Sequence, residues 1–89
     1  MSVYDKPLWK VYIARCADNT LYCGISSNVD KRINLHNSGK GAKYIRGSRI
    51  PAVLVIMSVA MSCGDALTLE RLIKTLPRSK KVAFIKKTR

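Results

Sequence analysis

The chain has 89 residues, of which 47% are hydrophobic, so it is long enough for one folded domain with a small core. Seventeen Lys and Arg residues outnumber five acidic ones, and the formal net charge of +12 favours a polyanionic partner, most often nucleic acid. A generally solvated basic surface is the alternative. No apolar run approaches the roughly 20 residues of a membrane helix. Residues 1–10 also lack the apolar core of a signal peptide. We therefore expect a cytoplasmic protein without a membrane partner or an obligate protein partner.

Cysteine spacing argues against disulfides and against zinc. Cys16, Cys23 and Cys63 are odd in number and form no CxxC pair. We interpret them as small apolar residues of a protein in a reducing compartment.

Residues 1–7 are predicted to form a loose lead-in, and residues 8–87 a single domain. The domain begins with two short runs rich in β-branched and aromatic residues on either side of residues 17–19, which predicts a β-hairpin. A two-residue loop would place Tyr12 and Tyr22 on opposite faces. A three-residue loop with Asn19 in the left-handed conformation pairs Tyr12 with Gly24 and places both tyrosines on one face. Gly24 would then leave room for a large group, or the tyrosines are simply half-buried sheet residues.

The next segment predicts a helix capped by Ser27 that ends at Ser38, with Gly39 just beyond it. Arg32 and His36 are four residues apart and therefore neighbours on the helix surface. They lie beside the apolar stripe, where they can face the hairpin.

A glycine-rich basic loop follows at residues 39–49. Glycines let the backbone approach a ligand closely, and cations suit phosphates. The alternative is a solvated basic loop. One helical turn is expected at residues 42–46. The candidate nucleic-acid contacts are Lys40, Lys43, Arg46 and Arg49, with Tyr44 among them.

Residues 51–60 are nearly all apolar, which predicts a fully buried central strand. An amphipathic helix is predicted over residues 62–76, where Glu70 falls at the margin of the apolar face that includes Leu72. A partly desolvated carboxylate there needs a cation, either a metal ion or a basic side chain. Residues 78–87 indicate a last helix with its lysines, Lys81 among them, turned to solvent.

These tyrosines and charged residues together resemble the GIY-YIG nuclease domain. The series is Val11-Tyr12-Ile13, then Tyr22-Cys23-Gly24, then Arg32, and it extends through His36, the loop at residues 39–44 and Glu70. Val-Tyr-Ile replaces the usual Gly-Ile-Tyr, and Cys23 replaces an Ile or Val. The resemblance covers residues 8–85 and is to the small single-domain, YhbQ-like branch of bacterial proteins.

This resemblance implies an α+β fold with a small three-stranded antiparallel sheet flanked by helices, in the order β-β-α-(short α)-β-α-α. The implied activity is metal-dependent hydrolysis of DNA by an endonuclease or exonuclease of low sequence specificity, in repair or structure-selective processing. Glu70 would bind one Mg²⁺ or Mn²⁺ ion. Tyr12 would act as the base or position the attacking water, and Arg32 would hold the scissile phosphate. The supporting catalytic groups would be Tyr22, His36 and Tyr44.

Two other functions agree with the same residues. One is a nucleic-acid-binding module that keeps the nuclease fold with little or no catalysis. The other is a structural or protein-binding role in which the basic loop has no nucleic-acid ligand.

Overall fold

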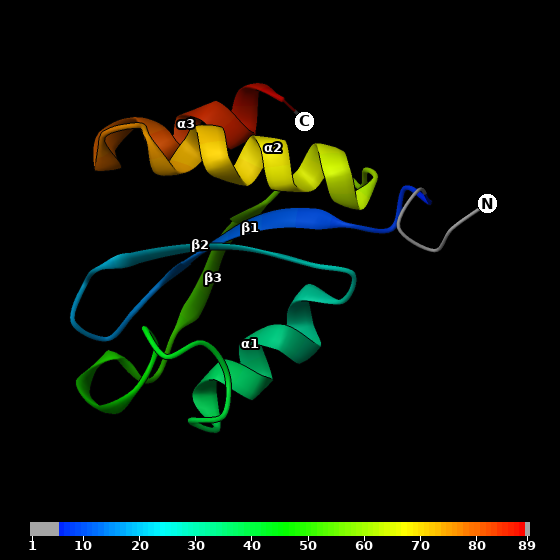
Figure 1. The fold of residues 1–89 in the computed structure, drawn as a ribbon. Coiled ribbons are helices and arrows are strands. Elements are labelled where there is room, and N and C mark those ends of the chain that lie inside the picture. Colours follow the sequence, from blue (N-terminus) through cyan, green and yellow to red (C-terminus); the bar gives the residue numbers. More distant parts are fainter. Residues whose placement is uncertain (1–5, 89) are drawn as a thin grey trace.

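The computed structural model describes residues 6–88 (Figure 1). Its elements in chain order are β1 (Lys10–Arg15), β2 (Leu21–Ser26), α1 (Val29–Asn37), the 3-10 helix η2 (Gly47–Arg49), β3 (Val53–Met57), α2 (Cys63–Lys74) and α3 (Arg78–Lys87). This is the predicted α+β architecture with a three-stranded antiparallel sheet. Of the predicted lead-in, residues 1–5 lie outside the described residues. Within residues 6–88, no helix has both the length and the apolar character that crossing a bilayer requires.

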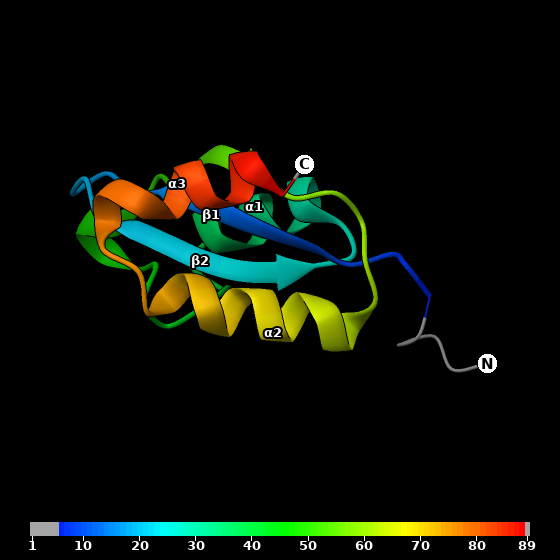
Figure 2. The same ribbon diagram turned by 90° about the horizontal axis from the view of Figure 1, so that it is seen from above.

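The sheet lies between two helical layers, with α2 and α3 on one face and α1 on the other (Figures 1 and 2). The strand order is β2-β1-β3, so β1 is central. Successive side chains of a strand point to opposite faces. Val11 and Ile13 therefore pack with residues of α2 and α3, whereas Tyr12 and Ala14 pack with α1 and the loop that follows it.

The hairpin has the three-residue loop that places both tyrosines on one face. Tyr12 pairs with Gly24 and Ala14 with Tyr22. Asn19 has a φ of 68°, the left-handed conformation expected of it. The Asp18 carboxylate also accepts hydrogen bonds from the Thr20 amide, at 3.1 Å, and from the Thr20 hydroxyl, at 2.6 Å. These short-range bonds close the loop and thereby fix the register of the pair.

The prediction of a fully buried central strand at residues 51–60 is wrong. The strand is shorter, it lies at an edge of the sheet, and Val53 is 53% exposed. Val55 is the extra residue of a bulge, because Ile13 pairs with Ile56 and Ala14 with Leu54. An apolar run indicates burial but does not identify neighbouring strands. The central strand is β1, whose residues 11–14 are all fully buried.

Helix boundaries follow the predicted signals with small shifts. Asn28, not Ser27, caps α1 by accepting a hydrogen bond from the Lys31 amide, and Gly39 follows the helix with a φ of 81°. Ser62 caps α2 as predicted. A single turn closes at residues 42–45, but the short helix comes later, as η2.

Two side-chain predictions on the helices are wrong, and the cysteines are mostly buried as predicted. Leu72, expected on the buried face of α2, is exposed. Lys81, expected to face solvent, is half-buried and donates to the Ile73 carbonyl oxygen at 2.9 Å, at the end of α2. All three cysteines are free; Cys16 and Cys23 are buried as interpreted, and Cys63 is half-buried.

Candidate active site

A chain of two hydrogen bonds holds the hydroxyl of Tyr12 in the interior. Tyr12 on β1 and His36 on α1 are each 0% exposed, and the Tyr12 hydroxyl lies 2.7 Å from His36 Nε2. The Ala42 amide donates to His36 Nδ1 at 3.1 Å. Because a backbone N–H can only donate, Nδ1 carries the lone pair and the neutral ring carries its proton on Nε2. His36 therefore donates to Tyr12, and the phenol keeps its own proton for another partner.

Two glycines allow this close packing. A Cβ at Gly24 would lie 2.7 Å from Tyr12 Oη and 2.9 Å from Tyr22 Cε2. A Cβ at Gly41 would lie 2.2 Å from His36 Nδ1. The space beside Gly24 is thus filled by the two tyrosine rings themselves, which corrects the expectation that it is open for a ligand.

Tyr22 and Tyr44 continue the cluster outward from Tyr12. The Tyr22 ring lies 6.2 Å from the Tyr12 ring, 5.2 Å edge-on from His36 and 6.0 Å from Tyr44 in a stacked arrangement, measured between centroids. The Arg49 guanidinium lies 4.2 Å from the centroid of the Tyr44 ring. Such aromatic and cation–π contacts hold Tyr44 although its loop is exposed.

Burial keeps the two buried groups uncharged. Burial raises the pKa of Tyr12 well above its usual 10, the neighbouring Tyr22 adds to the rise, and Arg32 opposes it through hydrogen bonding and charge. Burial and the positive charge of Arg32 lower the pKa of His36 below its usual 6.5. At neutral pH the pair is therefore a phenol and a neutral imidazole.

The Arg32 side chain has a hydrogen-bond donor that no described residue satisfies. Its Nε is buried and, among the described residues, has no hydrogen-bond partner. A buried polar atom of this kind is costly unless a ligand completes it. The guanidinium of Arg32 influences the pKa of both Tyr12 and His36, so Arg32 is near the buried pair.

Glu70 belongs to α2, which lies on the opposite face of the sheet from α1. Its side chain is 20% exposed and lies 3.7 Å from Lys74 Nζ, one turn further along the helix. Burial raises the pKa of Tyr22, and the charge of Glu70 adds to the rise while Lys74 and Arg32 oppose it. The charge of Glu70 thus influences the pKa of Tyr22, which is part of the cluster. The other five candidate catalytic residues come from the α1 side of the sheet.

Glu70 is the candidate metal ligand, and the described residues place no cluster of further metal-binding side chains around it. Among residues 6–88, no group of three or more His, Cys, Asp or Glu side chains is arranged to hold one. Mg²⁺ often keeps several waters and binds through one or two carboxylates and substrate phosphates. Glu70 fits this donor set, because it is partly buried and its Lys74 partner is only loosely placed.

The cations of the basic loop differ in whether they contact other residues of the protein. Lys40, Lys43 and Arg46 are exposed. Arg49 instead forms an ion pair with Asp18 at 3.1 Å, so this cation is engaged within the protein. Sequence reasoning missed Asp18, whose ion pair with Arg49 joins distant parts of the chain, and the packing of Gly41 against His36. Lys74 was detectable, since it stands four residues after Glu70.

Comparison with known proteins identifies the family of the chain. Residues 8–83 match the model of the GIY-YIG catalytic domain, and the chain belongs to the GIY-YIG nuclease family.

Small bacterial proteins named UPF0213 are similar to most of the chain. One from Nitratidesulfovibrio vulgaris is 42% identical over 88% of this chain and 70% of its own length. Another from Staphylococcus haemolyticus is 47% identical over 84% of this chain and 90% of its own. The solution NMR structure of a UPF0213 protein from Bacillus halodurans superimposes with a TM-score of 0.53 at 42% identity, covering 88% of this chain and 82% of that one.

Proposed function

We propose that this protein is a divalent-metal-dependent nuclease that hydrolyses DNA phosphodiester bonds with low sequence specificity. The observation that carries the proposal is the arrangement of Tyr12, His36 and Arg32. A phenol oxygen accepts a hydrogen bond from His36 and lies beside a guanidinium with an unsatisfied Nε. In this proposal the phenol transfers the proton and the guanidinium binds the anion.

Tyr12 would position the attacking water and, as phenolate, accept its proton. The His36 Nε2–H and the Arg32 charge both favour the phenolate, while burial opposes it. His36 does not take the proton of Tyr12, because its Nε2 already carries one. Its role is to orient the phenol oxygen and to connect it to the basic loop through the Ala42 amide.

Arg32 would bind a non-bridging oxygen of the scissile phosphate, since planar guanidinium donors match phosphate geometry. Lys40, Lys43 and Arg46 would hold flanking phosphates from the exposed loop. Glu70 would hold the Mg²⁺ or Mn²⁺ ion at the β2 edge of the cluster. When bound, such an ion neutralises charge on the phosphate and acidifies water.

A nucleic-acid-binding module without catalysis is the second candidate. Two observations favour it: the raised pKa of Tyr12 makes it a poor base, and Glu70 already has Lys74 as its cation. This candidate predicts binding that weakens steeply with salt, with no strand cleavage in any metal.

Cleavage assays with Glu70→Gln separate the two candidates. Purified protein is incubated with supercoiled plasmid, single-stranded, duplex and branched DNA, in Mg²⁺ or in Mn²⁺. We expect the parent to cut at least one substrate, and Glu70→Gln, which keeps shape but loses charge, to bind equally well and cut at least about 100-fold more slowly. Equal cleavage by Glu70→Gln would refute the proposed metal site, and no cleavage by the parent would favour the binding module.

A further inference from the structure

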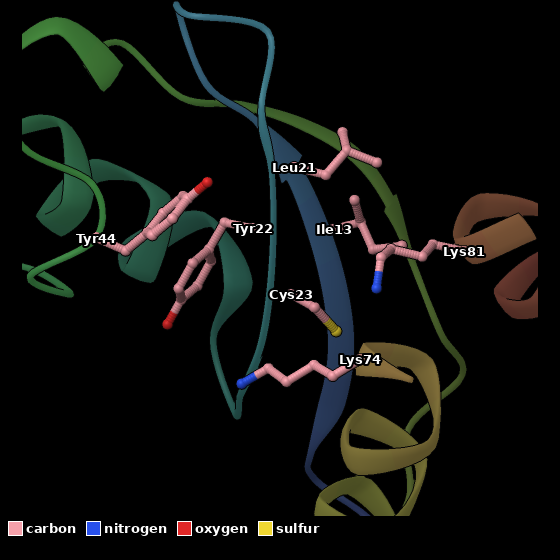
Figure 3. A pocket seen from close by; sticks show the side chains of 7 residues that line it. All are labelled: Ile13, Leu21, Tyr22, Cys23, Tyr44, Lys74 and Lys81. Atoms are coloured by element: carbon pink, nitrogen blue, oxygen red, sulfur yellow. The ribbon is translucent and has the colours of Figure 1, made fainter. Parts of the chain in front are cut away.

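A pocket of about 340 Å³ opens over the edge strand β2, beside the candidate active site (Figure 3). Tyr22 and Tyr44 lie on one side of the strand, and the lysines of α2 and α3 on the other. The pocket shares its two tyrosines with the active-site cluster and is therefore continuous with it. Its lining residues are Ile13, Leu21, Tyr22, Cys23, Tyr44, Lys74 and Lys81.

The charges of the lining suit an anion. Lys74 and Lys81 are both cations, and no acidic side chain is among the lining residues. Burial raises the pKa of the Cys23 thiol to about 11, so this group stays neutral. Lys81 is fixed by its bond to the Ile73 carbonyl oxygen. Lys74 is 54% exposed and only loosely paired with Glu70, so a phosphate can recruit it.

The rest of the lining suits a flat apolar group. Ile13, Leu21 and the neutral Cys23 form an apolar wall on one side of β2, and the two tyrosines lie on the other side of the strand. The Tyr44 ring is already engaged, by stacking with Tyr22 and by the Arg49 guanidinium. A base entering the pocket would therefore meet the edges of these rings and the aliphatic wall. Pockets that bind small ligands combine an apolar lining with a few such polar groups.

We propose that this pocket is a nucleotide subsite. It takes one nucleotide of the substrate next to the scissile phosphate, with its base on the apolar wall and its phosphate on Lys74 and Lys81. The inference rests on the proposed function and adds a second set of contacts to it. The substrate would cross the edge of β2, held by the basic loop on one side and by α2 and α3 on the other.

Binding of small probes tests the subsite without cleavage. ¹⁵N-labelled protein is titrated with dTMP, with deoxyribose 5-phosphate and with inorganic phosphate at constant ionic strength. We expect dTMP to shift the amide signals of residues 21–23 and to bind several-fold more tightly than the two probes that lack a base. Equal affinity for all three probes, or shifts confined to residues 39–49, would overturn the proposal.

Lysine variants supply the matched comparison. Lys74→Met should weaken dTMP binding about threefold or more, through loss of one phosphate contact. Lys86→Met removes the same charge from an exposed position in α3 outside the pocket and should leave binding unchanged. Lys74→Arg should restore part of the affinity. Equal affinities in Lys74→Met and Lys86→Met would refute the subsite. The outcome is separable from that of the nuclease proposal, because the parent's cleavage of DNA is measured independently and requires no dTMP binding.

Discussion

Three residues from different parts of the chain determine the environment of the Tyr12 hydroxyl. His36 donates to it, Arg32 supplies positive charge, and Gly24 leaves room for its ring. A three-residue loop with Asn19 in the left-handed conformation predicts that the tyrosines share a face. It does not reveal the tautomer of His36, which depends on an amide six residues further on. That bond makes the histidine a donor to Tyr12, which is the basis of the positioning role that we propose for it.

Stability should depend on pH through His36, the chain's single histidine. Its lowered pKa means that the unfolded chain binds a proton at higher pH than the folded protein does. The free energy of unfolding should therefore fall as pH drops below about 6.5, by at most about 1.4 kcal/mol per pH unit. Urea denaturation between pH 7.5 and 5.5 measures this free energy of unfolding. We expect His36→Gln to show a weaker dependence of that free energy on pH. Identical profiles for the parent and His36→Gln would contradict the buried neutral imidazole.

Gly24→Ala should disturb both tyrosines at once. The added methyl group would stand within 3 Å of both tyrosine side chains, as close as 2.7 Å to Tyr12 Oη. We expect a loss of roughly 1–3 kcal/mol in stability, as for other overpacked sites, together with slower cleavage. Gly64→Ala is the control, because a Cβ there meets nothing within 4 Å. If both variants unfold at the parent's urea midpoint, the tight packing around Gly24 is not real.

At the scale of elements, short-range signals predicted most of what the structure shows. The hairpin register follows from a loop of three residues, and the start of α2 from a Ser cap. The position of β3 could not be predicted, because an apolar run says nothing about which strand lies next to it. The approach of Glu70 to Tyr22 likewise depends on how α2 packs along β2 (Figure 2).

One long-range contact holds α1 against β3 and so places Arg32 and His36. Asn37 at the end of α1 accepts from the Ala52 amide at 2.7 Å and donates to its carbonyl oxygen at 3.0 Å. Asn37→Ala should cost about 1–3 kcal/mol in thermal or urea unfolding, because two half-buried backbone groups lose their partners. Asn34→Ala, at an exposed position of the same helix, should cost much less. Equal losses would show that the Asn37 bonds do not anchor the helix.

At the scale of the whole molecule, the edge of β2 is where the two helical layers contribute to one site. The α1 layer brings Arg32 and His36, and α2 brings Glu70. The strand β3 lies on the far side of β1 and contributes none of the six candidate catalytic residues. The charge of +12 favours attraction of a polyanion, while the chemistry that we propose would be confined to this edge.

The most direct test of Tyr12 as a catalytic residue is single-turnover cleavage by Tyr12→Phe in Mn²⁺, on whichever DNA the parent cuts. This change removes one buried oxygen and keeps the ring that packs beneath α1. We expect cleavage to slow by about 100-fold or more, as for loss of a positioned acid–base group, with DNA binding retained and thermal unfolding showing a folded protein. Cleavage at the parent's rate by Tyr12→Phe would contradict the placement of Tyr12 at the reacting centre.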